Sequence, residues 1–245
     1  MKILGIIPSR YASTRFPGKP LAMIAGKSMI QRVYEQASKS PSLTKVIVAT
    51  DDSRIFENVQ SFNGNVVMTS ENHLNGTSRC WEALEQNGES YEAIVNIQGD
   101  EPFIDPEQID QVAKLFKSND IEIGTLVKKI QSKEELFNPN VVKAVFDRQK
   151  KAMYFSRQAI PFLRDKQPGE YIANHDFYKH IGIYGYRFDI LKKIVKLKPA
   201  VMELAENLEQ LRWLENGFKI NVQITNKEAV SIDTPEDLLK LTNSA

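Results

Sequence analysis

The sequence predicts an α/β protein with a mostly parallel sheet and a small embedded strand-rich lobe. Two observations predict this fold class. Short apolar runs at 3–7, 46–49, 66–68 and 93–97 alternate with segments of helix length, which is the pattern of βαβ units. After about residue 120, strand-like runs follow one another more closely. We therefore expect one domain over 1–245, with residues 120–187 forming the small lobe.

The first helix has the best-marked start. Met29, Ile30, Val33, Tyr34 and Ala37 follow helical spacing, and Ser28 with Gln31 forms a capping-box signature just before them. Gly26-Lys27 is interpreted as a tight turn entering this helix, because a Walker A loop requires a glycine where Leu21 stands. Further helices are expected at 53–62, 77–85 and 106–117.

In the second half, the pattern predicts strands at 123–130, 141–146 and 180–186, separated by a polar stretch at 164–174. Helices are expected at 188–195 and 202–216, followed by strands at 220–224 and 229–232. The last helix begins at Thr234, a cap that is followed by proline at the first helical position.

The bulk composition excludes several classes of protein. The 245 residues suffice for one sizeable core, burying roughly 70–75% of the unfolded surface. A net charge of +1 provides no global field for nucleic acid or a membrane surface. Cys80 is the single cysteine, which excludes an internal disulfide and a cysteine metal cluster. With no apolar run near 18 residues, we expect a soluble protein of the reducing cytoplasm, without membrane insertion.

A rigid basic loop follows the first apolar run. Residues 8–20 contain three prolines and a glycine, together with the cations Arg10, Arg15 and Lys19 and the hydroxyls of Ser13 and Thr14. A loop at the carboxyl end of a buried strand lies where open α/β sheets bind ligands, and these groups suit a polyphosphate. The alternative is a solvated basic loop, which would need no fixed shape.

Two aspartates follow apolar runs. Asp100 comes after the strand at 93–97 and a glycine, and Asp233 ends the run at 229–232. Alone, each could be a turn or capping residue, but together they supply two hard oxygen ligands for Mg²⁺. Asp51 and Asp52 form a third acidic cluster, which suits helix capping or the metal motif of a glycosyltransferase.

Polar residues also mark two elements of the second half. Period-two geometry puts His180, Gly182, Tyr184 and Tyr186 on one strand face, which suits a hydroxylated sugar, although a lone histidine is more often structural. In the helix at 202–216, we expect Leu204, Leu208 and Leu211 to form a buried stripe. Glu209 and Gln210 would then lie on its flanks, facing solvent.

The whole chain resembles the sugar-acid cytidylyltransferases, and most closely those that activate 3-deoxy-manno-octulosonate (Kdo). The resemblance rests on six segments in order: RYASTRFPGKP at 10–20, HLNGTSR at 73–79, NIQGDEP at 96–102, HIGIYGY at 180–186, LEQLR at 208–212 and DTPEDL at 233–238. It implies the Rossmann-like three-layer nucleotide-diphospho-sugar transferase fold. It also implies formation of CMP-Kdo and diphosphate from CTP and Kdo for lipopolysaccharide synthesis.

The resemblance also implies roles for individual residues. Asp100 and Asp233 would hold the catalytic Mg²⁺ and act with Lys19 in catalysis. The nucleotide would be bound by Arg10, Ser13, Arg15, Lys19, Gly76, Thr77, Arg79 and Gln98. Kdo would be bound by Gln98, Arg157, His180, Tyr184, Glu209 and Gln210. Asn75 and Ser78 depart from the family pattern, which has serine and an acid there. The family also implies a homodimer assembled through the small lobe and a Kdo transferase acting downstream.

Three alternatives stay open at this point. The same chemistry could act on another sugar acid, such as sialic acid. The fold could serve as a non-catalytic nucleotide or sugar-acid sensor, although both metal aspartates argue against this. A metal-dependent glycosyltransferase would instead use a nucleotide sugar as donor.

Overall fold

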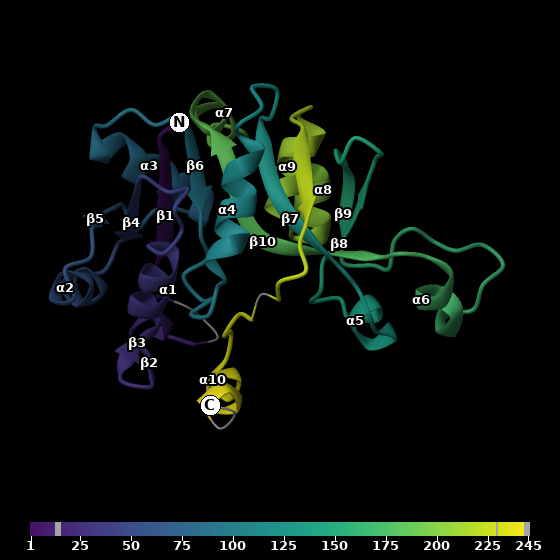
Figure 1. Ribbon diagram of the computed structural model, residues 1–245, viewed down its shortest axis with the longest axis horizontal. Coiled ribbons are helices and arrows are strands. Elements are labelled where there is room, and N and C mark those ends of the chain that lie inside the picture. Colours follow the sequence, from purple (N-terminus) through teal and green to yellow (C-terminus); the bar gives the residue numbers. More distant parts are fainter. Residues whose placement is uncertain (13–15, 229, 243–245) are drawn as a thin grey trace. The chain divides into compact units, whose positions relative to one another are not determined.

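The computed structural model describes residues 1–12, 16–228 and 230–242, without the side chains of 239–242, and divides into two compact units (Figure 1). The first unit comprises Met1–Lys114 and the segment after Glu228, and the second comprises Leu115–Glu228. The second unit extends beyond the lobe expected at 120–187 on both sides. No helix within the described ranges is long and apolar enough to cross a membrane.

The first unit contains a parallel sheet in the order β6-β1-β4-β5. Its strands are β1 (Ile3–Ser9), β4 (Lys45–Thr50), β5 (Val66–Met68) and β6 (Ala93–Asn96), as the apolar runs predict. β1 and β6 are almost wholly buried, which is typical of central parallel strands. Because parallel strands end at the same edge, residues 10, 51–52 and 97–100 all follow strands at one edge of this sheet.

Side-chain caps mark the helices of this unit. They are α1 (Met29–Ala37), α2 (Ser53–Ser61), α3 (Gly76–Asn87), α4 (Pro106–Leu115) and α10 (Pro235–Thr242). Ser28 Oγ accepts from the Gln31 backbone N–H, and Thr234 Oγ1 accepts from that of Asp237, which confirms the two predicted helix starts. Asp52 likewise caps α2 through the Arg54 backbone N–H, so the capping role suggested for this aspartate is confirmed.

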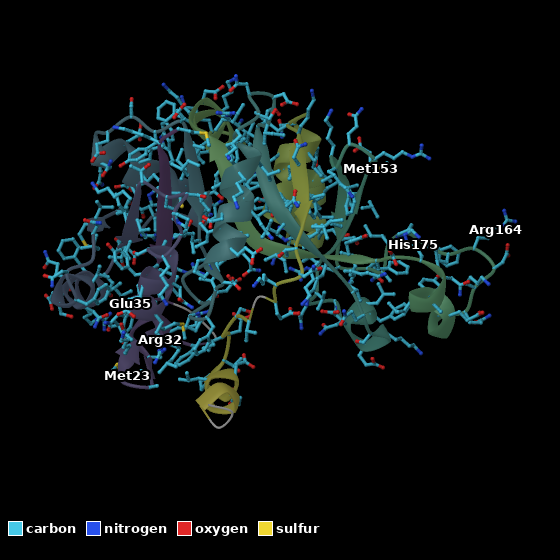
Figure 2. The ribbon with its side chains drawn as sticks, viewed as in Figure 1. Met23, Arg32, Glu35, Met153, Arg164 and His175 are labelled. Carbon is cyan, nitrogen blue, oxygen red and sulfur yellow. The ribbon has the colours of Figure 1, made fainter. Side chains whose placement is uncertain are left out.

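The tight turn before α1 is confirmed as part of a small hairpin. Strands β2 (Met23–Ile24) and β3 (Lys27–Ser28) are joined by Ala25 and Gly26, both with positive φ, and follow the 3-10 helix η1 (Lys19–Leu21). The hairpin is fastened to α1, because Arg32 Nε donates to the Ile24 carbonyl and Lys27 pairs with Glu35 (Figure 2).

The second unit contains mixed strand pairing. β7 (Ile123–Lys129) pairs parallel with β11 (Ile220–Ile224) and antiparallel with β10 (Tyr178–Arg187). β8 (Lys143–Phe146) pairs with both β10 and β9 (Ala152–Ser156). The sequence reading missed β9, a short strand next to the charged run at 147–151. The shorter helices are α5 (Lys133–Phe137), η2 (Pro168–Glu170), α6 (Tyr171–Asn174) and α7 (Phe188–Ile194).

The single helix expected at 202–216 is wrong. The structure has α8 (Val201–Glu206) and α9 (Glu209–Glu215), separated by Asn207 in the left-handed region with φ of 51°. Asparagine tolerates this conformation and can end a helix. The break also changes which leucines are buried, because Leu204 is 70% exposed while Leu208 and Leu211 are buried.

The strand expected at 229–232 is also wrong for residues 230–232, which form no strand; residue 229 lies outside the described residues. The backbone N–H of Ile232 instead donates to the carbonyl of Asp100 at 2.9 Å. The Ile232 side chain is buried against Ile24 and Met29. This single backbone bond fixes the chain beside β6 one residue before Asp233.

Candidate active site

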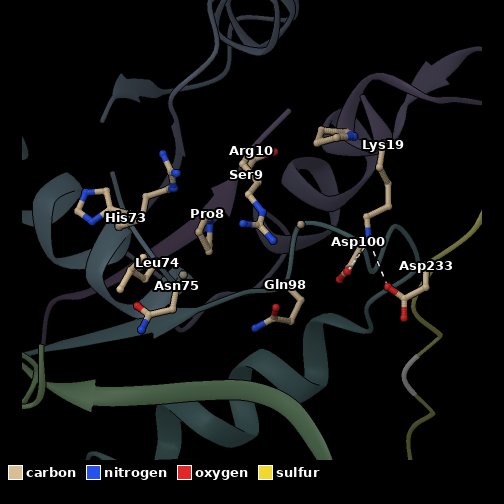
Figure 3. Close-up of a pocket in the computed structure, with 14 residues that line it drawn as sticks. Pro8, Ser9, Arg10, Lys19, His73, Leu74, Asn75, Gln98, Asp100 and Asp233 are labelled. Carbon is tan, nitrogen blue, oxygen red and sulfur yellow. Dashed lines mark hydrogen bonds and ion pairs between the residues drawn. The ribbon is translucent and has the colours of Figure 1, made fainter. Parts of the chain in front are cut away.

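A pocket of about 270 Å³ lies at the carboxyl ends of β1 and β6, within the first unit (Figure 3). It brings together segments that are far apart in the sequence, each carrying a predicted site residue. The lining residues are Pro8, Ser9, Arg10, Lys19, Pro20, His73, Leu74, Asn75, Gly76, Arg79, Gln98, Gly99, Asp100 and Asp233. The strand-edge position expected from the sequence is therefore the position found.

One ammonium group joins the two candidate metal ligands. Lys19 Nζ donates to Asp100 Oδ2 at 2.8 Å and lies 3.4 Å from Asp233 Oδ1 (Figure 3). The Lys19 side chain is only 14% exposed, whereas that of Asp233 is 36% exposed. Asp233 thus lies beside Asp100. In this structure both carboxylates form ion pairs with Lys19.

The donor set at this point fits a magnesium ion. Both carboxylates reach the same cationic group, so they can also reach one metal ion, and magnesium prefers such hard oxygen ligands. Among the described residues, no cluster of three or more histidine, cysteine, aspartate or glutamate side chains could hold a metal. Two carboxylates leave coordination positions for water and substrate phosphate, which is the usual way that magnesium is bound with nucleotides.

Stacked side chains hold the stem of the basic loop. The Arg54 guanidinium lies 3.3 Å from the centre of the Tyr11 ring and forms two hydrogen bonds to the Asp52 carboxylate. On the loop's return, Gly18 N donates to the Tyr11 carbonyl, and a Cβ at Gly18 would lie 3.0 Å from the Tyr11 ring. With φ of +70°, position 18 requires glycine for both reasons.

Arg10 and Lys19, which flank this loop, line the pocket. The nucleotide-binding candidates Ser13 and Arg15 lie outside the described residues. Their predicted roles therefore stay predictions.

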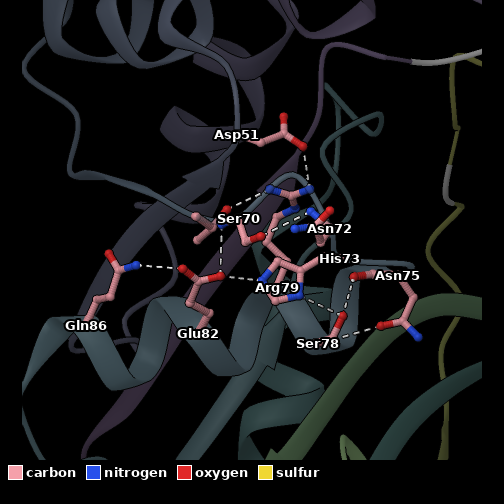
Figure 4. Close-up of polar contacts among 10 residues, drawn as sticks. Asp51, Ser70, Asn72, His73, Asn75, Ser78, Arg79, Glu82 and Gln86 are labelled. Carbon is pink, nitrogen blue, oxygen red and sulfur yellow. Dashed lines mark hydrogen bonds and ion pairs between the residues drawn. The ribbon is translucent and has the colours of Figure 1, made fainter.

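A polar network holds the opposite wall of the pocket (Figure 4). Arg79 is buried, and its two terminal nitrogens donate at 2.6 Å to Thr69 Oγ1 and Asp51 Oδ2. Asp51 thus anchors Arg79, a contact that the sequence reading did not predict. Contacts of this kind fix the guanidinium in place while leaving N–H groups to face a ligand.

The same network contains His73, whose ring contacts Ser78 Oγ through Nδ1 and Glu82 Oε2 through Nε2 (Figure 4). The Glu82 carboxylate also accepts from the Ser70 backbone N–H, which helps to lower its pKa against the effect of burial. Ser78 and Asn75, the two departures from the family pattern, form the start of α3: Asn75 Oδ1 accepts from Ser78 N. Both substitutes therefore have structural partners.

The remaining candidates of this unit occupy close-packed positions. Gly76 lies against Pro8, and a Cβ there would come within 3.1 Å of the proline ring. Thr77 is buried, and Gln98 lines the pocket two residues before Asp100. Glu101 is buried beside Asp100, and burial raises its pKa to about 8, so this carboxyl is held mostly protonated at neutral pH.

The other sugar-binding candidates lie in the second unit. His180, Tyr184 and Tyr186 form a row of rings on one face of β10, as predicted, even though a register shift between Ile181 and Tyr184 interrupts the pairing with β7. Trp213 of α9 packs edge-on against both tyrosines. This packing brings α9 and its first-turn residues against the β10 face.

His180 is held as a neutral ring. Burial lowers its pKa to about 3, and Nε2 lies 3.0 Å from Thr125 Oγ1. Thr125 Oγ1 also lies 2.7 Å from Ile183 O and 3.2 Å from Ile181 O, and because carbonyl oxygens only accept, we assign its one hydroxyl hydrogen to a carbonyl and the ring N–H of His180 to Nε2. The Nδ1 atom is then a hydrogen-bond acceptor. The hydroxyl of Tyr184 is buried and has no hydrogen-bond partner among the described residues.

Arg157, Glu209 and Gln210 flank the break between α8 and α9. Arg157 donates to the backbone carbonyls of Glu206, at the end of α8, and of Asn207, within the break, and Glu209 and Gln210 form the first turn of α9. Gln210 is 6% exposed, so the expectation that both side chains face solvent is wrong for this residue. The expected placement assumed one continuous helix, and the break rotates the first turn of α9 inward.

The sequence reading missed the residues that hold these groups. Thr125 fixes His180, and Glu206 accepts from Ser156 Oγ and the Arg157 backbone N–H. Thr125 lies in a mostly apolar strand, and its hydroxyl is the one feature of the sequence there that could have indicated a buried polar contact. Glu206 lies on a short helix whose end was not predicted.

Comparison with known proteins assigns the family. The family model described as cytidylyltransferase matches residues 4–221. The chain belongs to the cytidylyltransferase family. It is 56% identical over 98% of its length to a protein of Parabacteroides distasonis called 3-deoxy-manno-octulosonate cytidylyltransferase, covering 96% of that protein. A Cytophaga hutchinsonii protein of the same name is 53% identical, with 100% of this chain and 98% of that protein covered.

One solved structure is similar to this cytidylyltransferase over its whole length. It is described as a CMP:2-keto-3-deoxy-manno-octonic acid synthetase complexed with CTP, and it matches with a TM-score of 0.92 and 37% identity. The match covers 100% of this chain and 98% of that one. The mixed α/β fold with a mostly parallel central sheet is thereby confirmed, as is the nucleotidyltransferase class.

Proposed function

We propose that this cytidylyltransferase transfers the cytidylyl group of CTP to Kdo, giving CMP-Kdo and diphosphate. One observation carries the proposal: Lys19 joins Asp100 and Asp233 inside a pocket that Arg10 also lines. At this edge of the sheet, the cations can bind a triphosphate and the two carboxylates can bind its metal ion. The full-length similarity to proteins named for Kdo supports the choice of sugar acid.

The reaction is an in-line displacement at the α-phosphorus. The anomeric hydroxyl oxygen of Kdo attacks the α-phosphorus and loses its proton to water. The bond from the α-phosphorus to the oxygen that bridges it to the β-phosphorus breaks, and diphosphate leaves with that oxygen. No covalent enzyme intermediate is needed, so positioning and charge neutralisation supply most of the acceleration. Arg10 and Lys19 neutralise charge on the departing diphosphate, since both cations line the pocket.

Asp100 and Asp233 are the residues that would hold Mg²⁺, which polarises phosphate oxygens and lowers the pKa of a nearby hydroxyl. The chain itself prepares this pair. The Ile232–Asp100 backbone bond fixes the two segments beside each other, and the Lys19 ammonium offsets one of the two negative charges.

Recognition of Kdo is assigned to Arg157, His180, Tyr184, Glu209 and Gln210 of the second unit, whereas the sugar-binding role expected for Gln98 of the first unit stays a prediction. A hydroxyl-rich acid requires fixed donors and acceptors, and the second unit supplies them as buried side chains, Tyr184 and Gln210, and as partly buried ones. His180 Nδ1 accepts, and the Tyr184 hydroxyl has no hydrogen-bond partner within the part of the chain that the structure describes. The homodimer and the hand-over of CMP-Kdo to a downstream transferase belong to the same proposal.

One experiment tests the proposal against its alternatives. The purified protein is incubated with CTP and Mg²⁺ and, in parallel, with Kdo, sialic acid and other sugar acids, and diphosphate release is followed. We expect release with Kdo only. Release with sialic acid alone would reassign the sugar. CTP binding without any release would favour a nucleotide sensor.

A further inference from the structure

The second unit contains a buried ammonium group to which no role has been given above. Lys143 of β8 is fully buried, with 0% of its surface exposed. Its Nζ donates to the backbone carbonyls of Asn138, Val141 and Arg157 at 3.0, 2.6 and 2.5 Å. Three N–H groups meet three carbonyls, so the charge is stabilised within the core. The lysine thereby ties the 138–141 loop to the backbone of Arg157.

Arg157 is held from both sides. Its backbone carbonyl accepts from Lys143, and its guanidinium donates from Nε to Glu206 O, from Nη1 to Pro139 O and from Nη2 to Asn207 O, at 2.7, 3.1 and 3.2 Å. A guanidinium has five N–H groups. The three bonds leave one N–H on each terminal nitrogen, which is the number that a carboxylate engages in a bidentate pair.

The charges around Lys143 do not balance. The ionised groups that act on it are the Glu206 carboxylate and the Arg157 guanidinium. Burial is the main cause that lowers the Lys143 pKa, and Arg157 adds to the lowering while Glu206 opposes it. Two cations face one carboxylate, whose oxygens are already occupied by Ser156 Oγ and the Arg157 N–H. One positive charge is left for an anion.

We infer that Lys143 is a positioning residue for the carboxylate of the sugar acid: it fixes Arg157 and provides the excess positive charge that the carboxylate neutralises. The inference rests on the proposed function and assigns a role to a residue that never touches the substrate. Its ammonium group acts by holding the Arg157 backbone carbonyl and by making the electrostatic potential around Arg157 more positive. Replacing it should therefore change the preference for an acid over a neutral analogue, and not merely stability.

The experiment compares Kdo with its neutral analogue, in which the carboxyl group is reduced to an alcohol. For Lys143→Met, we expect kcat/KM for Kdo to fall by about 10²-fold, the scale for misplacing a binding group by about 1 Å. The alcohol, tested as a competitive inhibitor, should bind the variant about as it binds the wild type. The affinity of CTP, measured by calorimetry, should not change.

Lys128→Met is the matched control. Lys128 is a mostly buried lysine of the same unit, but it pairs with the carboxylate of Glu228 rather than with carbonyls. Its loss should leave the acid-to-alcohol ratio unchanged. Tryptophan fluorescence, measured with Trp81 replaced by Phe so that Trp213 alone emits, reports whether each variant keeps the packing of Trp213 against Tyr184 and Tyr186.

Glu206→Gln keeps the inference testable if Lys143→Met does not fold. Removing the negative charge increases the positive excess, so KM for Kdo should fall relative to the alcohol's inhibition constant. A purely structural role predicts equal weakening of acid and alcohol in both variants, and that result would overturn the inference. An absence of Kdo-dependent diphosphate release in the wild-type protein would overturn the proposed function as well. That failure is seen before any variant is compared.

Discussion

The two units hold their candidate ligands in opposite ways. In the first unit the key groups are charged and pair across long sequence separations, since Lys19 reaches partners 81 and 214 positions away. In the second unit they are mostly buried, with His180 neutral and ringed by aromatic side chains. The charged groups of the first unit can exchange one ionic partner for another, which suits a reaction step in which charge develops on the substrate. The fixed, mostly buried groups of the second unit suit discrimination between similar ligands.

The largest effect is expected for the carboxylate pair. Asp100→Asn or Asp233→Asn should lower kcat by about 10²–10³ or more, because each removes a preorganised electrostatic element. Diphosphate release at saturating Mg²⁺ measures this effect, and the melting temperature serves as the control for folding. Wild-type turnover in either variant would contradict the metal assignment. It would also mean that the charged groups of the first unit are not the ones that carry the chemical step.

Lys19→Ala should lower turnover by about 10²-fold while changing CTP affinity much less, since charge on the leaving diphosphate grows toward the transition state. Lys19→Arg should not restore full activity, because the planar guanidinium is larger than the ammonium that fits between two carboxylates. Steady-state kinetics with varied CTP separate the two parameters. A raised KM with unchanged kcat would show that Lys19 contributes uniform binding only.

In the second unit, His180→Ala and Glu209→Ala should each reduce kcat/KM for Kdo and leave CTP binding nearly intact. Leaving a polar partner unsatisfied costs about 1–3 kcal/mol, so a roughly 5- to 150-fold loss is expected for each. Calorimetry with CTP is run beside Kdo-dependent diphosphate release. Weakened CTP binding with an unchanged Kdo dependence would move these residues out of the sugar site.

The smallest effect concerns pH. The folded-state pKa of His180, about 3, lies below the ordinary histidine value of 6.5, so the unfolded chain binds more protons between these values. The contribution of the neutral ring to stability is therefore complete above pH 6.5 and decreases as pH falls toward 3. Denaturant unfolding of the wild type should show a steeper loss of stability below pH 6.5 than His180→Asn. Parallel curves would mean that His180 is not buried as a neutral ring.

Much of the first unit could be predicted from sequence because its signals are local. Apolar runs mark β1, β4, β5 and β6, and capping residues mark the starts of α1 and α10. The strand-end positions of Arg10 and Asp100 follow directly from those runs. The pairing of Asp51 with Arg79 could not be predicted, because it joins two segments through tertiary packing rather than through any local pattern.

The second unit was less predictable for a physical reason. Leu204, Leu208 and Leu211 fit one helical stripe, and only the left-handed Asn207 breaks it. Lys143 is flanked by apolar residues in a strand, where a charged side chain is ordinarily assigned to the solvent face. Its burial depends on carbonyls contributed by a loop and by the residue that follows β9. Hydrogen bonds of this kind join residues that lie in different segments of the fold, so the spacing of residues does not predict them.

The backbone bond between Ile232 and Asp100 has a consequence for how the enzyme is made. A ribosome releases Lys19 and Asp100 well before Asp233, and all of Leu115–Glu228 is synthesised in between. A nascent chain can therefore form most of the parallel sheet, yet the pair of Asp100 and Asp233 is incomplete until the second unit has been translated. The pocket of the first unit is thus completed only after the polypeptide that carries the proposed Kdo-binding residues has been made.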